Sequence, residues 1–419
     1  MLLRRQREPT TGNRHDGTGS GSKKLMKFIK NFFERRQHLF TKGGKFEKLG
    51  PLFEATETFF FIPGIPTTKD VHVRDSLDLK RFMSIVILAL MPPFIFGIYN
   101  AGYQSCLASG LPLGFGTVFL KGLVIVLPII FVSYGVGFFW EILFAVIRRH
   151  PISEGLLVTG LLFPLTLPPT IPLWQVALGI SFGVVIGKEI FGGTGRNILN
   201  PALTARAFLF FAYPARMSGD SVWTVVGNTG EKVADAVSGA TPLAIAGIAG
   251  FHEKIDMLLA TGGYSFTKLF VGHYPGSIGA TSALLCLVGA ALLILSGIAS
   301  YRIILGGVLG VLCTGFFLNL IAVDSSRAWF SLNPFYHLIM GGFAFGIIYM
   351  ATDPVSAPGM NRSKWIYGFF IGALTVLIRV FNAAYAEGIM LAILFMNLFA
   401  PLLDHFEVKL RLKKRMKNV

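Results

Sequence analysis

The sequence predicts an all-α polytopic membrane protein with about ten transmembrane helices, arranged as a 5+5 inverted repeat that includes broken helices. Of its 419 residues, 53% are hydrophobic and only 14% are charged, and the mean hydropathy is +0.61. A soluble protein carries charges on about a quarter of its residues, which cover its surface. That charged surface is missing, so the chain belongs in a bilayer.

Ten apolar stretches are long enough to cross a bilayer or nearly so, for which about 20 residues are required. They run over 82–100, 119–147, 155–169, 173–191, 200–213, 278–298, 302–321, 335–351, 365–381 and 388–404. The third and fifth are short, prolines crowd the third, and GGTGRN precedes the fifth. We expect broken or re-entrant helices there, because irregular backbone at membrane depth survives only inside protein or beside a cavity.

A weak internal likeness relates the two halves of the chain. The stretch 173–193 resembles 335–354 in its aromatic start, its glycine-rich middle and its polar exit. Five helices in each half would give the halves opposite orientations, as in transporters with inverted repeats. Glycine-rich apolar segments also resemble each other by chance, so the repeat is a hypothesis.

The basic residues predict the orientation in the membrane. Lys and Arg gather at the two ends of the chain and in alternate short loops, as on the cytoplasmic side of a membrane protein. We expect a multi-pass membrane protein with both termini cytoplasmic. This pattern differs from the dispersed basic groove of a nucleic-acid binder, so we expect no nucleic-acid partner.

This orientation divides the chain into five parts. They are a basic cytoplasmic segment (1–81), transmembrane helices 1–5 (82–213), an outer-face loop (214–277), transmembrane helices 6–10 (278–404) and a basic cytoplasmic tail (405–419). Apolar and aromatic residues interleave along the outer-face loop, so we expect it to form a folded cap.

The outer-face loop contains the stretch DAVSGATPLA, residues 235–244. Its small residues allow a tight turn, Thr241 stands where a helix N-cap is preferred, and Pro242 suits the first helical position. The N-terminus of a helix favours an anion such as phosphate. Without further context, a plain loop-to-helix cap is the better explanation of the stretch.

The order acid, two spacers, Ser, Gly, Ala, Thr resembles the flavinylation motif, in which a transferase links FMN through its phosphate to the threonine hydroxyl. The likeness extends to HVRDSLDLKRFM, FGGTGRNILNPALTARAFLFFAYPA, MATDPVSAP and EGIMLAILFMNLFAPLLDH. Together these segments resemble the family of B subunits of the sodium-translocating NADH:quinone oxidoreductase. The ferredoxin:NAD oxidoreductase complex has a homologous flavin-carrying D subunit. That counterpart typically lacks the basic segment Lys23–Lys80, which favours the quinone-reducing complex.

The resemblance implies FMN in a phosphoester bond to Thr241, with Asp235, Ser238, Gly239 and Ala240 in the motif that the flavin transferase recognises. It also implies a second flavin, non-covalent riboflavin, in the membrane part. We place riboflavin near Asn197, Asn200 and Pro201, which are polar or irregular groups at membrane depth.

The resemblance further implies ubiquinone as substrate, Na⁺ as the transported ion, membrane lipid as surroundings and the bacterial inner (cytoplasmic) membrane as location. The implied partners are an FMN-carrying subunit, a subunit with NADH, FAD and iron–sulfur sites, and small membrane subunits. No metal beyond Na⁺ is expected, because Cys106, Cys286 and Cys313 lie far apart and show no ligand spacing.

Glu141 lies inside the second apolar stretch, where a carboxylate is costly and marks a functional site by default. The alternative is a structural ion pair with Arg148 or Arg149. The resemblance places Gly137 and Glu141 at or beside the quinone site, and Glu141 also on the sodium path.

Three other residues are candidates for the sodium path. Asp404 resembles an acidic residue implicated in sodium uptake, and carboxylate oxygens suit hard cations; an interfacial position is the alternative. Phe343 and Phe345 could form an apolar constriction that controls ion passage, with plain packing as the alternative. A transporter of the same fold without any redox role also accounts for the helices, but it leaves DAVSGATPLA unexplained.

Overall fold

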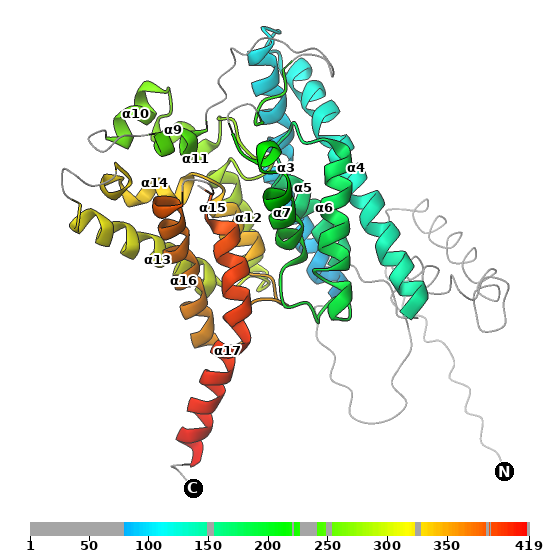
Figure 1. Cartoon of the computed structure of the whole chain (residues 1–419), viewed down its shortest axis with the longest axis vertical. Coiled ribbons are helices and arrows are strands. Elements are labelled where there is room, and N and C mark those ends of the chain that lie inside the picture. The colour runs from blue at the N-terminus through cyan, green and yellow to red at the C-terminus, as the bar shows by residue number, and fades with distance from the viewer. Residues whose placement is uncertain are drawn as a thin grey trace, which may run out of the picture. The chain divides into compact units, whose positions relative to one another are not determined.

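The computed structural model describes residues 79–148, 155–219, 222–226, 241–248, 254–322, 328–382, 385 and 387–416. The chain forms two compact units, residues 1–69 with 145–152 and residues 70–144 with 153–419. Nearly all described residues belong to the second unit, whose helices are labelled in Figure 1.

Every regular element among the described residues is helical, which confirms the predicted all-α class. The first half contains α3 (Leu79–Ala108), α4 (Phe115–Arg148), α5 (Gly155–Leu165), α6 (Leu173–Val185), η2 (Glu189–Phe191) and α7 (Pro201–Ala212). The connection contains α8 (Pro214–Met217), α9 (Pro242–Ile248), α10 (Ile255–Thr261) and α11 (Phe266–Val271). The second half contains α12 (Ala283–Leu295), α13 (Tyr301–Leu320), η3 (Ala328–Ser331), α14 (Pro334–Ile339), α15 (Phe343–Phe345), η4 (Gly346–Met350), α16 (Asn361–Phe381) and α17 (Ile389–Met416).

All ten predicted apolar stretches contain helix. Within the described residues, six helices are long and apolar enough to cross a membrane: α3, α4, α6 with η2, α13, α16 and α17. Three more, α5, α7 and α12, are apolar but shorter. The remaining stretch, the eighth (335–351), is divided among α14, α15 and η4. The polytopic membrane fold is therefore confirmed.

The backbone at the end of the short third helix forms hydrogen bonds with the segment before α12. α5 has 11 residues, fewer than the roughly 20 that span a bilayer. Beyond it, the amide of Ile278 donates to the carbonyl of Leu167 (3.1 Å), and the amide of Gly279 donates to the carbonyl of Leu165 (2.7 Å). These bonds satisfy backbone groups that lipid could not satisfy.

The helix of the second half breaks at a pair of glycines between α14 and α15. Gly341 and Gly342 have φ of 62° and 68°, a left-handed conformation that L side chains rarely adopt. The buried Arg379 guanidinium donates to the carbonyls of His337 (2.5 Å) and Met340 (2.7 Å) at the end of α14. The break is thus stabilised by a charge from α16.

Some helices at equivalent positions of the two halves pack in equivalent ways in the second unit, while the inverted repeat itself stays a prediction. The first and sixth apolar helices, α3 and α12, pack together, as do the fifth and tenth, α7 and α17. The pair α6 and α7 in the first half matches α16 and α17 in the second. The sequence likeness between 173–193 and 335–354 does not follow this arrangement, because it joins the unbroken fourth helix to the broken eighth.

Glycines bring α13 and α16 into backbone contact. A Cβ on Gly310 would overlap the carbonyl oxygen of Phe369, and a Cβ on Gly372 would overlap that of Gly307. Small residues at such positions drive helix association in membranes, where lipid is as apolar as the side chains. The α13–α16 pair therefore forms a rigid frame for the second half.

The connection between the halves is folded where the structure describes it. α9 packs on α10, and α11 packs on α12 and α14. Figure 1 shows α9, α10 and α11 together beyond α14, at the end of the second unit opposite to the last turns of α17. Their position on the outer face of the membrane stays a prediction.

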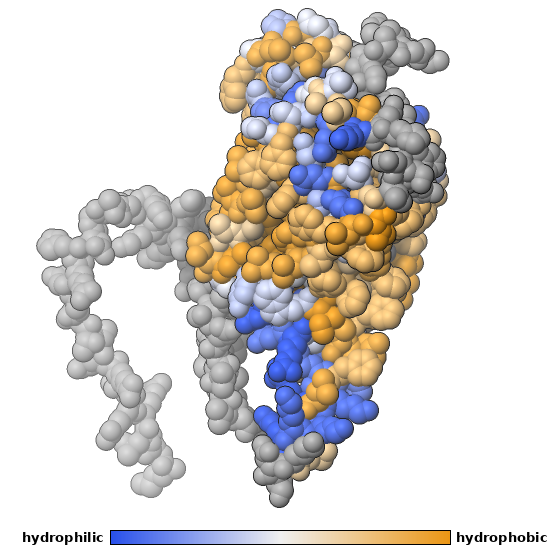
Figure 2. All heavy atoms as spheres, turned by 90° about the vertical axis from the view of Figure 1, so that its left-hand side faces the viewer, coloured by the Kyte–Doolittle hydropathy of each residue, from blue (hydrophilic) through white to orange (hydrophobic). Residues whose placement is uncertain are grey.

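The surface of the described helices suits a bilayer. Leu305, Leu309, Phe316 and Phe317 of α13 and Phe370 of α16 are among many large apolar side chains exposed on the chain. Figure 2 shows a largely apolar face that gives way to hydrophilic residues at its lower end. Exposed apolar area on this scale marks contact with lipid or protein.

We expect Gly341→Ala to destabilise the protein by about 1–3 kcal/mol, the usual cost of forcing a non-glycine residue into strained backbone. Its new methyl group would also overlap Leu243 and lie 2.9 Å from Nη2 of Arg379. Thermal unfolding in detergent measures the loss. Gly135→Ala is the control, since a Cβ there meets nothing within 4 Å; equal losses in both variants would contradict the assignment of the break.

Candidate functional site

A cavity of about 310 Å³ lies where the connection meets the broken helix. Thr241 and Leu243 line it from the start of α9, and Gly341 and Gly342 line it from the break after α14. Further lining residues come from α7, the segment before α12, α16 and the residues that precede α17. Ligand pockets in proteins begin at about 300 Å³, so this cavity has the size of a small-molecule site.

Thr241 is the N-cap residue that the sequence predicts. Its Oγ1 accepts a hydrogen bond from the amide of Ala244 (3.1 Å), and its carbonyl accepts one from the amide of Ile245 (3.0 Å). Pro242 begins α9. The predicted motif residues Asp235, Ser238, Gly239 and Ala240 lie outside the described residues, so Thr241 alone ties the motif to the cavity.

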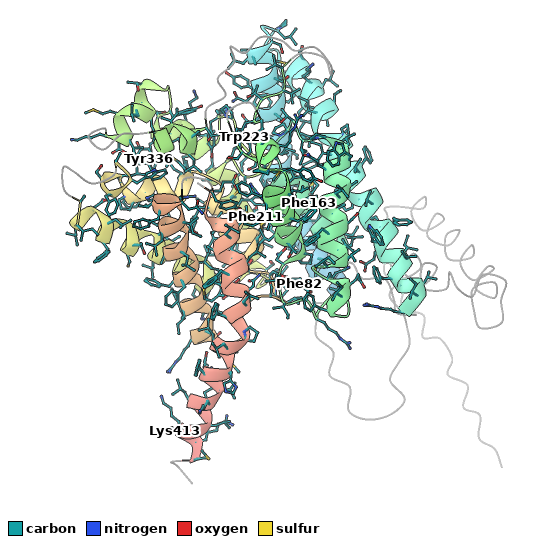
Figure 3. The ribbon with its side chains drawn as sticks, viewed as in Figure 1. Phe82, Phe163, Phe211, Trp223, Tyr336 and Lys413 are labelled. Atoms are coloured by element: carbon teal, nitrogen blue, oxygen red, sulfur yellow. The ribbon has the colours of Figure 1, made fainter. Side chains whose placement is uncertain are left out.

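Aromatic side chains form part of the cavity wall. The rings of Phe210 and Tyr385 meet edge to face with centroids 4.3 Å apart, and both line the cavity. Trp223 and Trp329 line it as well, and each is less than a tenth exposed. Figure 3 shows Trp223 between α7 and the connection. Such walls suit a flat aromatic ligand.

Two buried arginines converge on one glutamate at this cavity. Arg206 of α7 forms an ion pair with the Glu387 carboxylate, and Nε of Arg379 donates to the Glu387 carbonyl (3.1 Å). Both arginines are 1% exposed. Two positive charges against one negative charge leave this group with a net charge of +1. The group was not predicted from the sequence, although an arginine within a predicted span is itself a functional signal.

Two buried hydroxyl groups at the cavity are unsatisfied. The hydroxyls of Thr281 and Tyr385 have no hydrogen-bond partner among the residues that the structure describes. Both residues line the cavity and are less than a tenth exposed. A buried polar group without a partner costs about 1–3 kcal/mol, so a ligand that supplied the missing bonds would bind with that advantage.

A second, smaller cavity contains the residues predicted to bind riboflavin. Asn197, Asn200 and Pro201 line a space of about 70 Å³ together with Lys188 and Asp353. Phe82, which also lines it, lies well below Trp223 in Figure 3. The volume is below that of ordinary ligand pockets. Binding of riboflavin at this cavity stays a prediction.

The two asparagines have local hydrogen-bond partners. Asn200 caps α7, because its Oδ1 accepts from the amides of Ala202 (3.0 Å) and Leu203 (3.4 Å). Asn197 donates from Nδ2 to the carbonyl of Leu199 (3.0 Å). Their observed contacts therefore shape the broken segment before α7, and their contact with riboflavin stays a prediction.

Glu141 belongs to a buried group of three charges. The Lys188 ammonium forms ion pairs with Glu141 and, at 3.3 Å, with Glu189. All three residues are at most 3% exposed. The alternative partner expected from the sequence was Arg148 or Arg149; the partner found here is Lys188, which follows α6. Lys188 lies near the end of the fourth predicted stretch (173–191), and spacing along the chain does not reveal which helix ends meet.

Gly137 packs against neighbouring helices. A Cβ there would lie 3.1 Å from Cδ1 of Leu156 and 3.5 Å from Cγ1 of Ile180. Gly137 therefore lets α4 approach α5 and α6, one turn away from Glu141. The space beside it is filled by protein, so the quinone site at Gly137 and Glu141 stays a prediction.

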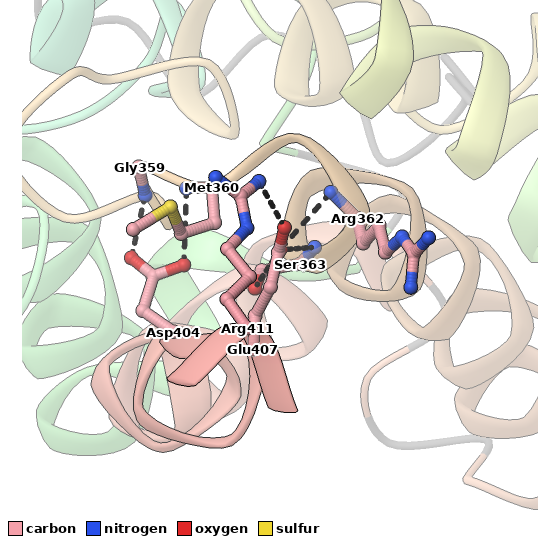
Figure 4. A network of polar contacts seen from close by, with 7 residues as sticks. All are labelled: Gly359, Met360, Arg362, Ser363, Asp404, Glu407 and Arg411. Atoms are coloured by element: carbon pink, nitrogen blue, oxygen red, sulfur yellow. Dashed lines mark hydrogen bonds and ion pairs between the residues drawn. The ribbon is translucent and has the colours of Figure 1, made fainter. Parts of the chain in front are cut away.

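Asp404 caps the loop that leads into α16. Its carboxylate accepts hydrogen bonds from the amides of Gly359 (2.6 Å) and Met360 (3.1 Å), as Figure 4 shows. Glu407, one turn later, accepts from the amides of Arg362 (3.2 Å) and Ser363 (3.0 Å). Two carboxylates from α17 thus satisfy amides at the start of α16. A role of Asp404 in sodium uptake stays a prediction.

Phe343 and Phe345 are packed inside the protein. They are 2% and 0% exposed, and the ring of Phe345 lies 5.1 Å from that of Tyr349. This agrees with the packing alternative. The proposed constriction of a sodium path stays a prediction.

The fold and the cavity define a class: a helical, polytopic membrane protein with a cavity of small-molecule size at one end of its bundle. The model of the NQR2, RnfD, RnfE family matches residues 66–413. The chain belongs to this family.

Relatives cover nearly the whole chain. A protein of Pseudomonas paraeruginosa (strain DSM 24068 / PA7) is 47% identical over 93% of this chain and 98% of its own length. One from Stutzerimonas stutzeri (strain A1501) is 49% identical over the same shares. One from Yersinia pestis is 47% identical over 92% of this chain and 98% of its own. Each is named as the B subunit of a Na(+)-translocating NADH-quinone reductase.

We expect Lys188→Met to destabilise the protein by about 3–5 kcal/mol, because it removes the cation between two buried carboxylates. Thermal unfolding of the detergent-solubilised protein measures the loss. Arg148→Gln is the matched control and should have a much smaller effect. A larger loss of stability in Arg148→Gln than in Lys188→Met would instead support Arg148 as the ion-pair partner of Glu141.

We expect Asp404→Ala and Glu407→Ala each to lower stability by about 0.5–2 kcal/mol, the range for loss of a helix cap. If capping is the role of Asp404, the Na⁺ concentration that half-saturates activity of the assembled complex stays unchanged in both variants. A rise in that concentration for Asp404→Ala alone would instead support the predicted sodium role.

Proposed function

We propose that this chain is a membrane subunit of a Na⁺-translocating NADH-quinone reductase, carrying electrons through FMN bound to Thr241 and a second flavin to ubiquinone. Outward movement of Na⁺ is coupled to that electron flow. The observation that carries the proposal is that Thr241, the acceptor in a flavinylation-like motif, opens onto a cavity of about 310 Å³. The names of relatives that cover 92–93% of the chain support the same complex.

The residues of the cavity fit an FMN group. The Thr241 side chain stands at the wall, the aromatic residues suit a flat ring, and the unsatisfied hydroxyls of Thr281 and Tyr385 supply hydrogen-bonding capacity. The net charge of +1 on Arg206, Arg379 and Glu387 favours an anionic ligand. FMN bound here would supply reversible electron transfer, since the redox chemistry belongs to the flavin.

The chain's own residues position the ligand and exclude water. The Thr241 hydroxyl accepts a hydrogen bond from the amide of Ala244, which fixes the attachment point at the N-terminus of α9. Arg379 joins the end of α14 to Glu387, so the wall on that side is built from two helices and a loop. A rigid wall keeps the distance between electron carriers constant.

The coupling must supply enough free energy for export of Na⁺. Moving one charge against 100 mV costs about 2.3 kcal/mol. Ubiquinone, riboflavin and Na⁺ are parts of the proposal, with the candidate residues named above. The partners that it requires are an FMN-carrying subunit, an NADH/FAD/iron–sulfur subunit, small membrane subunits and a flavin transferase.

One alternative follows from the family itself, whose description also includes RnfD and RnfE. In that case the chain would carry its flavin in the ferredoxin:NAD oxidoreductase complex. Sodium-stimulated reduction of quinone by NADH in the purified assembly supports the first function. Failure to reduce quinone, with retained ferredoxin-linked activity, would favour the second.

We expect Thr241→Ala to abolish ultraviolet fluorescence of the denatured polypeptide on a gel, because the hydroxyl that forms the phosphoester is removed. The wild-type protein, produced in a host with the flavin transferase, should fluoresce. Thr261→Ala is the control, since Thr261 is an exposed threonine of α10. A fluorescent Thr241→Ala band, or a dark wild-type band, would reject covalent attachment at this residue and favour a transporter without a redox role.

A further inference from the structure

Tyr385 occupies an unusual position in the cavity wall. It lies between α16 and α17, is 4% exposed, and packs edge to face on Phe210 of α7. Its hydroxyl has no hydrogen-bond partner among the described residues. Burial raises the pKa of Tyr385, so the hydroxyl keeps its proton and remains a donor. A retained buried donor of this kind is explained by a ligand acceptor.

The charges behind Tyr385 favour a negative acceptor. Arg206 and Glu387 both interact electrostatically with the tyrosine, and Glu387 is already paired with Arg206. The second arginine, Arg379, lines the cavity and leaves the group with its excess positive charge. Two buried arginines and the partly buried Glu387, with a net charge of +1, therefore lie beside Tyr385 in the cavity wall.

A flavin ring becomes negatively charged on reduction, and the net positive charge of this wall complements that change. Uptake of two electrons, supplied from NADH through the complex, together with one proton leaves a single negative charge on the reduced ring. The oxidised ring is neutral. A donor hydroxyl and a nearby positive charge therefore stabilise the reduced form more than the oxidised form, which raises the midpoint potential.

We propose that the Tyr385 hydroxyl, supported by Arg206 and Arg379, donates a hydrogen bond to the pyrimidine edge of the flavin attached to Thr241 and raises its midpoint potential. This inference rests on the proposed function. Tyr385 is thereby a potential-setting residue of the flavin site, and Thr281 offers a second hydroxyl to the same ring.

The test is a spectroelectrochemical titration of the purified, complete complex. The signal of this flavin is isolated by subtracting the titration of the Thr241→Ala complex. Tyr385→Phe should reduce the preference for the reduced ring about tenfold, which lowers the midpoint potential by about 30 mV for a two-electron couple. Thr281→Val should lower it in the same direction.

Both variants are expected to fold, because each removes a hydroxyl that makes no hydrogen bond within the described protein. Tyr367→Phe is the matched control: that buried hydroxyl donates to Asn397 (2.5 Å) and lines neither cavity. It should leave the potential unchanged. A potential equal to wild type in Tyr385→Phe would overturn the inference, whatever the result for Thr281→Val.

The fluorescence of the denatured chain distinguishes failure of the Tyr385 inference from failure of the proposed function. If wild type and Tyr385→Phe both carry the covalent flavin and share one potential, the role of Tyr385 is wrong while the proposed function stands. If the wild-type chain carries no flavin at Thr241, the proposed function fails first.

Discussion

The structure depends on one constraint: within a bilayer, every buried backbone amide, carbonyl and charge must find its partner inside the protein. Continuous helices meet this requirement by themselves. The broken helices do not, so each break is paired with a side chain or backbone from elsewhere. Arg379 donates hydrogen bonds to carbonyls at the end of α14. Asp404 and Glu407 accept hydrogen bonds from amides at the start of α16 and just before it. Amides before α12 donate to carbonyls at the end of α5.

These partners explain why the cavity at Thr241 exists where it does. Gly341 and Gly342, in left-handed conformation, turn the chain away from the axis of α14, and Leu243 of α9 packs against that turn. Arg379 then bridges the broken end to the segment that precedes α17. The space enclosed between these elements is a consequence of the break, and the arginine that stabilises the break also gives the cavity its positive charge.

The buried charges form two separate groups. One surrounds Glu387 beside the cavity, and the other joins Glu141, Lys188 and Glu189 between α4 and the end of α6. Isolated charges would be expensive in this environment, whereas grouped charges of opposite sign are tolerated. Each group ties together helices that lie far apart in the sequence, so each also fixes the relative positions of those helices.

The sequence by itself determined the all-helical membrane fold, the positions of its apolar stretches and the capping role of Thr241. Hydrophobicity and N-cap preference are local properties, readable within about 20 residues of chain. Only the tertiary structure decided that Lys188 pairs with Glu141, that Asp404 caps α16, and that Arg206 and Arg379 meet at Glu387. The contacts of Asp404 with Met360, Lys188 with Glu141 and Arg206 with Glu387 join residues 44, 47 and 181 positions apart. They depend on how the helices pack, which no local pattern of residues encodes.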